Sequence, residues 1–377
     1  MKRLLIYIII CVVAIPLWAQ SESEAVASEP TERTSLAQLI ATGLTNNYGL
    51  RIVRNEERLA ESNATRANAG MLPKVGLTAG YSGSLSSGNT TSRTANTTEQ
   101  TRNVLGHTLN AGINADWTVF DGFKIQANYQ RLQELRRQGA TQTRIALEDY
   151  VADLTAEYYN FVQQRLRLHN LRNAVALSKE RLRIVLERYS IGSASRLDLQ
   201  QAQVDFNADS ALSLKQHELL ASSRIRINEL LAAKNMNSLL AVTDSIINVD
   251  TAMVYDLLWE KTLHTNAALL NAAHNKTLAE IDFRSVRSRD YPYVKLAAGY
   301  GYTQNHYNKG ATSKRNNWGV DFGVTVGFNI FDGNRRRERR NAQINIDNAE
   351  LARLELEKTL QADLTDLWQA YKNNLRL

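Results

Sequence analysis

The chain contains one long sequence pattern twice. Val119-Phe120-Asp121-Gly122 recurs as Ile330-Phe331-Asp332-Gly333 about 210 residues later. The stretch at 72–81, which begins Leu-Pro-Lys-Val, has a counterpart at 291–300. Further upstream matches at nearly the same spacing are Asn47 with Asn266 and Leu59-Ala60-Glu61 with Leu278-Ala279-Glu280. Because the matches are collinear and the unit is long, we interpret the chain as two halves of one architecture and not as a short solenoid repeat.

The N-terminus carries the features of a secretory signal. A basic pair and an apolar run at 4–17 precede Ala19, which is a suitable cleavage point. We therefore expect a signal peptide at residues 1–19 and a mobile Ser/Glu-rich segment at 20–33. The single cysteine, Cys11, lies inside the apolar run, so the mature chain is expected to carry no disulfide. An uncleaved membrane anchor is the alternative, but the run is short for a span.

In four places the apolar residues alternate with a period of two. The pattern predicts strands at 74–83, 107–120, 293–304 and 317–331, with a Ser/Thr/Asn/Gly-rich loop at 84–103 after the first. One face of each strand is apolar and aromatic, and the other is small or polar, which is typical of a transmembrane β-strand. A soluble antiparallel sheet with one wet face is the alternative.

Two further arguments favour a membrane barrel. Past the signal, no apolar run is long enough for a membrane helix, and such a secreted chain is either soluble or crosses a membrane as a closed barrel. Four strands cannot close a water-filled barrel, so we expect several copies to combine. Asp116 and Asp321 would tune which solutes pass, although a polar lining alone also explains them, and alternation directs them and four other polar residues toward the lumen. These residues are Asn110, Asn114, Asp116, Asp321, Thr325 and Asn329.

A long helical pattern follows the first pair of strands. Residues 122–189 keep apolar spacings of four and three, the heptad pattern of a coiled coil, and would span roughly 100 Å as one helix. Gly192 suits a left-handed C-cap, and Ser195 with Asp198 forms a capping box for a return helix at 195–234. The sequence therefore predicts a long αα-hairpin.

The remaining segments complete the expected organisation. Helix is expected from about residue 36 to 70, with a break near Asn47, and again at 254–290 and from about 334 onward. The resulting divisions are a first repeat at 34–234, a linker at 235–253 with a short strand at 242–249, and a second repeat at 254–377.

Four features in this order resemble the TolC-like outer-membrane efflux protein family. They are the two-fold repeat, a helix then proline then strand in each half, the Phe-Asp-Gly turn from strand to helix, and Tyr189-x-x-Gly192-x-x-Ser195-x-x-Asp198 at the hairpin. The resemblance covers roughly residues 35 to 377. It implies a mixed fold, in which a homotrimer shares one transmembrane barrel of about 12 strands that continues into a periplasmic α-helical tunnel. The strand boundaries and turns it involves are Pro73, Phe120, Asp121, Gly122, Pro292, Phe331, Asp332 and Gly333.

The resemblance also implies roles at the hairpin. On the family motif, Gly192, Ser195 and Asp198 fall at the periplasmic tip, where an adaptor docks and the aperture closes. For Asp198 the capping box alone is an alternative, and the two interpretations are compatible. The second half is expected to have its own tip, and the printed sequence ends at Leu377 within the matching helix. About 65 residues of the pattern are therefore expected to lie outside the sequence.

The sequence offers little chemistry. The six histidines show no metal-ligand spacing and no Gly-Lys-Ser/Thr phosphate loop occurs, so we expect no catalytic, cofactor or metal site. Arg335-Arg336-Arg337-Glu338-Arg339-Arg340 lacks the aromatic companions of a nucleic-acid surface. Two interpretations of this arginine run remain: it contacts anionic lipid headgroups, or it is a solvated cationic turn of a helix.

We therefore expect a passive export duct in the outer membrane of a Gram-negative bacterium. The resemblance implies a homotrimer, a periplasmic adaptor protein, an inner-membrane pump and surrounding lipid as partners, with no nucleic acid. A duct dedicated to peptides or proteins is the nearest alternative, since specificity would lie in the partner pump. A periplasmic coiled-coil structural protein is opposed by the four alternating strands, and a secreted enzyme by the missing catalytic constellation.

Overall fold

The computed structural model describes residues 34–92, 97–243, 252–309 and 312–375. It divides into two compact units: Met1–Leu39 with Glu157–Ile247, called the hairpin unit, and Ile40–Ala156 with Asn248–Leu377, called the sheet unit. The expected signal peptide and the segment at 20–33 lie outside the described residues. The elements in chain order are α1 Leu36–Asn46, α2 Tyr48–Asn63, β1 Lys74–Ser92, β2 Thr97–Asp121, α3 Lys124–Ser190, α4 Arg196–Leu230, α5 Tyr255–Thr265, α6 Ala267–Arg287, the 3-10 turn η1 Ser288–Asp290, β3 Tyr293–Tyr307, β4 Lys314–Gly327 and α7 Arg335–Leu375.

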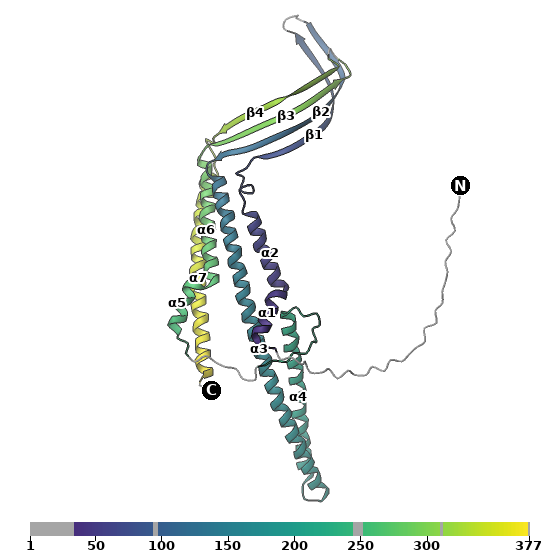
Figure 1. Cartoon of the computed structure of the whole chain (residues 1–377), viewed down its shortest axis with the longest axis vertical. Coiled ribbons are helices and arrows are strands. Elements are labelled where there is room, and N and C mark those ends of the chain that lie inside the picture. The colour runs from purple at the N-terminus through teal and green to yellow at the C-terminus, as the bar shows by residue number, and fades with distance from the viewer. Residues whose placement is uncertain (1–33, 93–96, 244–251, 310–311, 376–377) are drawn as a thin grey trace, which may run out of the picture. The chain divides into compact units, whose positions relative to one another are not determined.

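The sheet unit holds a four-stranded sheet in the order β1-β2-β3-β4, and each neighbouring pair is antiparallel (Figure 1). The expectation of a helix-rich chain with four strands is therefore confirmed. Within the described ranges, neither β1 nor β4 pairs with a further strand along its outer edge. Such an edge leaves a row of main-chain donors and acceptors unpaired.

The prediction of a loop at 84–103 is wrong for most of that stretch, because strand occupies 84–92 and 97–103. β1 continues to Ser92 and β2 begins at Thr97, and the two strands remain paired up to the Ser92–Thr97 pair, with one register shift between Ser86 and Gly88. Near that end the Thr91 and Thr98 hydroxyl oxygens lie 3.1 Å apart. A strand ladder is held by main-chain hydrogen bonds, so it can extend through polar residues that show no apolar alternation.

The fourth strand is displaced from its expected position. β4 spans Lys314–Gly327, whereas the sequence pattern predicted a strand at 317–331. The alternation of Phe328 and Ile330 continues that of β4, but these residues carry no strand pairing. The connection from the sheet to α7 therefore runs from 328 to 334 without regular structure.

Two of the helices before the strands are broken at matching asparagines. The side chain of Asn47 accepts a hydrogen bond from the Leu50 amide at the start of α2. The side chain of Asn266 accepts from the amides of Ala268 and Leu269 at the start of α6. Since each is an N-cap, the single helix expected at 254–290 is instead the pair α5 and α6. The helix expected to reach residue 70 ends at Asn63.

The hairpin unit packs the second part of α3 against α4. Tyr158 and Val162 from α3 and Ile227 from α4 are completely buried, as expected for apolar residues at heptad spacing. Gln216 Nε2 donates to Gln164 Oε1 at 2.7 Å and so satisfies a buried amide between the helices. α4 ends at Leu230 and not at 234, because Ala232 adopts a left-handed conformation with φ 51°.

The linker contributes little regular structure to the hairpin unit. Val242 forms an isolated parallel bridge with Thr34, and Asn228 Nδ2 donates to the carbonyls of Met236 and Ser238. Most of the strand expected at 242–249 falls on residues 244–251, which lie outside the described residues.

In the sheet unit, α6 and α7 lie side by side (Figure 1). Lys276 Nζ of α6 lies 3.1 Å from Glu350 Oε2 of α7. Hydrogen bonds from Arg353 and then from Lys276 lower the pKa of Glu350 to about 2. The carboxylate is therefore charged throughout the physiological range and holds the two helices together.

Candidate functional site

The register of the sheet brings most of the expected lumen residues onto one face. Residues paired directly across an antiparallel ladder project on the same side, and alternate residues along a strand do the same. The pairs on this face include Asn110 with Gly80 and Thr303, Asn114 with Gly76 and Gly299, Asp116 with Lys74 and Ala297, Asp321 with Gly299, and Thr325 with Lys295. Asn329 is the exception, because it follows the end of β4 and belongs to no face of the sheet.

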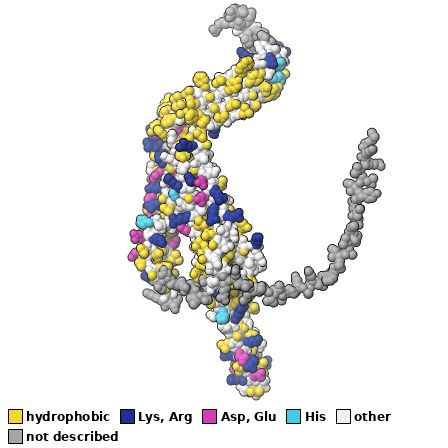
Figure 2. Space-filling model, in the orientation of Figure 1, with side chains coloured by type: hydrophobic (Ala, Val, Ile, Leu, Met, Phe, Trp, Pro, Cys, Tyr) yellow, Lys and Arg dark blue, Asp and Glu magenta, His cyan; other side chains and the backbone are white. Residues whose placement is uncertain are grey.

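The opposite face of the sheet is apolar and exposed. Hydrophobic side chains cover the strands in Figure 2. Their exposed fractions run from 52% for Ile113 to 85% for Phe322, in the set Val75, Leu77, Tyr81, Ile113, Tyr300, Trp318, Val320, Phe322, Val324 and Val326. A continuous apolar surface of this kind marks contact with a membrane or with another protein.

The first Phe-Asp-Gly turn is tightly packed. Gly122 has φ +69°, and a Cβ placed there would lie 2.1 Å from the main-chain oxygen of Ser288. Asp121 Oδ1 accepts a hydrogen bond from the Ile125 amide at 3.0 Å and so caps the start of α3. Phe123 stacks edge-on against Tyr291, with ring centroids 5.7 Å apart. The turn therefore fixes α3 against η1 and the start of β3.

The second Phe-Asp-Gly segment has another conformation. Asp332 Oδ1 accepts from the Asn334 amide at 2.9 Å, but Gly333 is not among the glycines with positive φ. Phe331 is 89% exposed and lies outside β4. The two copies of the motif are thus alike in sequence and different in structure. Pro73 and Pro292, by contrast, both directly precede the first residue of a strand.

Ion pairs surround the start of α7. Asp290 of η1 pairs with Arg335 and Arg339, and Arg289 pairs with Glu338 and lies 3.9 Å from Asp332. Arg335 Nη2 also donates to the Asn329 carbonyl at 2.7 Å. These contacts hold α7 to the turn that precedes β3.

At the tip of the hairpin, five residues connect the end of α3 to the start of α4. The Ser193 amide donates to the Arg188 carbonyl at 2.8 Å and the Gly192 amide to Tyr189 at 3.0 Å, with Gly192 at φ +79°. This is the Schellman arrangement that ends a helix. The sequence prediction of a C-cap at Gly192 matches this geometry.

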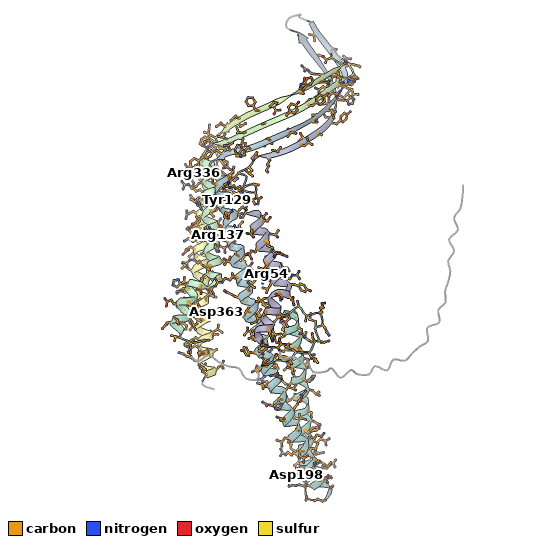
Figure 3. The ribbon with its side chains drawn as sticks, in the orientation of Figure 1. Arg54, Tyr129, Arg137, Asp198, Arg336 and Asp363 are labelled. Carbon is orange, nitrogen blue, oxygen red and sulfur yellow. The ribbon has the colours of Figure 1, made fainter. Side chains whose placement is uncertain are left out.

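Ser195 and Asp198 then start α4. Asp198 donates its amide to Ser195 Oγ at 3.1 Å, and its carboxylate accepts from the Ser195 amide at 2.9 Å and from the Ser195 hydroxyl at 2.7 Å. The Ser195 side chain, and then its main-chain amide, lower the pKa of Asp198. Asp198 lies at the far end of the hairpin in Figure 3. The capping box predicted from the sequence is therefore present.

A groove adjoins this tip between α3 and α4. It has a volume of about 680 Å³, and its lining mixes charged residues, among them Arg188, Asp198 and Asp205, with apolar residues such as Leu177 and Ile184. Sequence reasoning identified only Asp198 here. The facing groups share no motif and come together only because α4 runs back along α3.

Sequence reasoning also missed a buried polar cluster between α3 and α6 in the sheet unit. His274 Nδ1 lies 2.6 Å from the carboxylate of Glu134, which is only 6% exposed, and His274 Nε2 lies 3.1 Å from Thr141 Oγ1. Nearby, Gln138 Nε2 donates to Asn275 Oδ1 at 2.7 Å. The cluster satisfies buried polar groups and fixes the pairing of the two helices.

No group of three or more His, Cys, Asp or Glu side chains is arranged to hold a metal ion in the described ranges. Among the helices that the structure describes, none combines the length and apolar character needed to cross a membrane.

The family model described as outer membrane efflux protein matches residues 39–233 and 258–376. Outer membrane protein TolC of Vibrio cholerae serotype O1 is 20% identical over 296 residues, which is 78% of this chain and 64% of TolC. The chain thus spans less than two-thirds of the length of this curated relative.

Solved structures share the fold at low sequence identity. A membrane protein from Pseudomonas aeruginosa aligns with a TM-score of 0.75 and 17% identity, over 90% of this chain and 75% of that one. The Campylobacter jejuni CmeC outer membrane channel aligns with a TM-score of 0.68 and 17% identity, over 86% and 68%. Because the family model covers both halves of the sequence, the chain belongs to the outer membrane efflux protein family.

Proposed function

We propose that the protein is the outer-membrane channel of a tripartite efflux or secretion system and acts as a passive duct. The observation that carries this proposal is the two-faced sheet with unpaired edges at β1 and β4. In a membrane, its exposed apolar face would contact lipid, and its polar, glycine-rich face would contact water.

In this proposal three copies close the sheet into one barrel of about 12 strands, because four strands are too few to enclose a water-filled lumen. Edge β4 of one copy would pair with edge β1 of the next, which satisfies the unpaired main-chain groups. The repeated sequence would then supply two strands and one long helical segment from each half. Asn110, Asn114, Asp116, Asp321 and Thr325 would line the lumen, on the face where the register groups them.

The hairpin unit would extend into the periplasm as part of a helical tunnel. Its tip, with Gly192, Ser195 and Asp198, would meet a periplasmic adaptor protein and contribute to closure of the aperture. The groove beside Asp198 offers apolar and charged groups for such a contact. An inner-membrane pump would supply the energy, since the duct itself moves solutes by diffusion. The family supports placement in the outer membrane of a Gram-negative bacterium.

Conductance and ion selectivity test this function together. The full chain, reconstituted in planar bilayers, is expected to give stepwise ion currents. Their preference for cations over anions would be set by the carboxylates of Asp116 and Asp321 against Lys74 and Lys295, which the register puts on the same face. The double substitution Asp116→Asn with Asp321→Asn should lower that preference. The control Asp256→Asn with Glu260→Gln removes the same charge from exposed positions on α5 and should leave it unchanged. Absence of any current, or equal selectivity in both variants, would contradict the proposal.

A further inference from the structure

The arginine-rich start of α7 is divided into two faces. At 100° per residue, Arg335, Glu338 and Arg339 lie on one side of the helix together with buried Ala342. The charged residues on this side are paired with residues of η1: Arg335 and Arg339 with Asp290, and Glu338 with Arg289. This side therefore holds α7 against η1, and each of its charged residues already has an ion-pair partner.

The other face carries three arginines, Arg336, Arg337 and Arg340, here called the free trio. All three are exposed, and none forms an ion pair with another described residue. The next acid on the same side, Asp347, lies seven residues beyond Arg340, about 10 Å along the axis, and accepts a hydrogen bond from Gln343. The trio is thus a concentrated positive charge without a counterion among the described residues.

The residues just before this helix are apolar and unusually exposed. Phe328 is 51% exposed, and Ile330 and Phe331 are both 89% exposed. Phe328 and Ile330 continue the alternation of the apolar residues of β4, whose last member, Val326, is 68% exposed. The bond from Arg335 to the Asn329 carbonyl fixes this segment against the first turn of α7. Apolar side chains followed directly by unpaired cations are the arrangement that anchors a protein at a membrane surface.

We propose that the free trio binds the phosphate groups of anionic phospholipids in the periplasmic leaflet of the outer membrane, while Phe328, Ile330 and Phe331 enter the acyl region beside them. Charge complementarity and continuity with the apolar face of the sheet select lipid as the occupant. A planar guanidinium binds phosphate through paired hydrogen bonds, so three exposed arginines favour a lipid with net negative charge over a zwitterionic one. The inference rests on the proposed membrane placement of the sheet.

Arg336 marks the position of this surface directly below the strands (Figure 3), and dark blue side chains gather at the same level in Figure 2. The solvated helix turn that the sequence also allowed would bind no lipid class selectively. The two interpretations therefore differ in a measurable property.

Native mass spectrometry of lipid retention tests the inference. The full chain in a mild nonionic detergent is mixed with equimolar phosphatidylglycerol and phosphatidylcholine, and bound lipid is counted for each variant. Wild type is expected to retain phosphatidylglycerol preferentially, and R336Q/R337Q/R340Q to lose at least tenfold of that preference, since each arginine contributes roughly fivefold. R336K/R337K/R340K keeps the charge but loses the paired hydrogen bonds of guanidinium, and should therefore retain a preference between that of wild type and that of R336Q/R337Q/R340Q. R167Q/R172Q/K179Q removes the same charge from exposed positions of α3 in the hairpin unit and should behave as wild type.

Three outcomes would overturn the inference. The first is equal retention of both lipids by wild type, as expected of a surface reserved for an acidic protein or for solvent. The second is unchanged preference in R336Q/R337Q/R340Q. The third is displacement of the lipid by millimolar inorganic phosphate, which would indicate a site for free anions. Because the measurement uses detergent and requires no current, its failure is distinguishable from failure of the conductance experiment.

Discussion

Two glycines in the left-handed region are expected to differ in how much they tolerate a side chain. At Gly122 a Cβ would meet the Ser288 carbonyl oxygen at 2.1 Å, whereas at Gly192 no atom lies within 4 Å. Gly192→Ala should therefore cost only the left-handed strain, about 1–2 kcal/mol. Gly122→Ala must also move main chain in the turn before β3, and its cost should be clearly larger.

Thermal unfolding followed by circular dichroism checks this pair of substitutions. We expect a small decrease in the midpoint for Gly192→Ala and a large decrease, with reduced yield, for Gly122→Ala. Similar decreases for both variants would mean that the packing of Gly122 against η1 is not as described.

The capping box at the tip should make the start of α4 sensitive to acid. Because Ser195 lowers the pKa of Asp198, the box stabilises α4 fully above the ordinary carboxyl value of 3.8, and this stabilisation is lost as pH falls through the lower folded value. Amide exchange at the first turn of α4 should therefore be faster in strong acid than its intrinsic pH dependence predicts.

Two variants separate the two parts of this box. Ser195→Ala should cost about 1 kcal/mol of local helix stability, measured as faster amide exchange, and Ser195→Thr should restore protection because it keeps the capping hydroxyl. Asp198→Asn should abolish the extra acid sensitivity. An unchanged pH profile in that variant would assign the effect to another group.

At the scale of the strands, the two faces should differ in access to water. The register puts Asn114 and Thr325 on the polar face, and Ile113 and Val324 on the apolar face. In membrane-inserted protein with Cys11 replaced by serine, Asn114→Cys and Thr325→Cys should react with a small water-soluble thiol reagent, and Ile113→Cys and Val324→Cys should resist it. Labelling of all four positions to the same extent would argue for a soluble sheet.

Charge tolerance should follow the same faces. Val324→Arg would place a cation against the hydrocarbon and should cost roughly 2–4 kcal/mol near the bilayer centre, whereas Thr325→Arg should cost much less. The stability of refolded protein in lipid vesicles measures both. Equal costs would contradict the assignment of lipid and lumen faces.

Elements with strong periodicity could be predicted from the sequence. The heptads of α3, the Gly192 cap and the Ser195–Asp198 box identified the hairpin to within a few residues. The polar ends of β1 and β2 could not be predicted, because their Ser/Thr/Asn/Gly residues look like a loop and are ordered by the partner strand. The break at Asn266 could have been found, because its match to Asn47 was already visible.

Contacts between distant segments could not be predicted at all. Glu134 and His274 belong to different helices and show no motif, and their pairing depends on how α3 packs against α6. Likewise, the sequence shows a run of arginines but not which of them are neutralised, since Asp290 and Arg289 lie far from the run in sequence. Only the folded arrangement separates the paired arginines from the free trio.

For the whole molecule, the unpaired edges of β1 and β4 predict assembly. We expect three copies in the membrane-inserted particle, because closing the sheet needs more strands than one chain supplies. Mass measurement of the detergent-solubilised protein, corrected for bound detergent, gives the number directly. A stable inserted monomer would contradict both the stoichiometry and the closure of the sheet.

The different identities of the two edges have a consequence for mixtures of intact and damaged subunits. In the proposed ring each contact would join β4 of one subunit to β1 of another, so the interface would be head-to-tail and one subunit with a blocked β1 edge would interrupt the whole circle. If three subunits are drawn at random, the fraction of complete rings falls as roughly the cube of the intact fraction. An allele that damages only one edge would therefore be dominant, whereas an allele that abolishes synthesis would merely lower the dose.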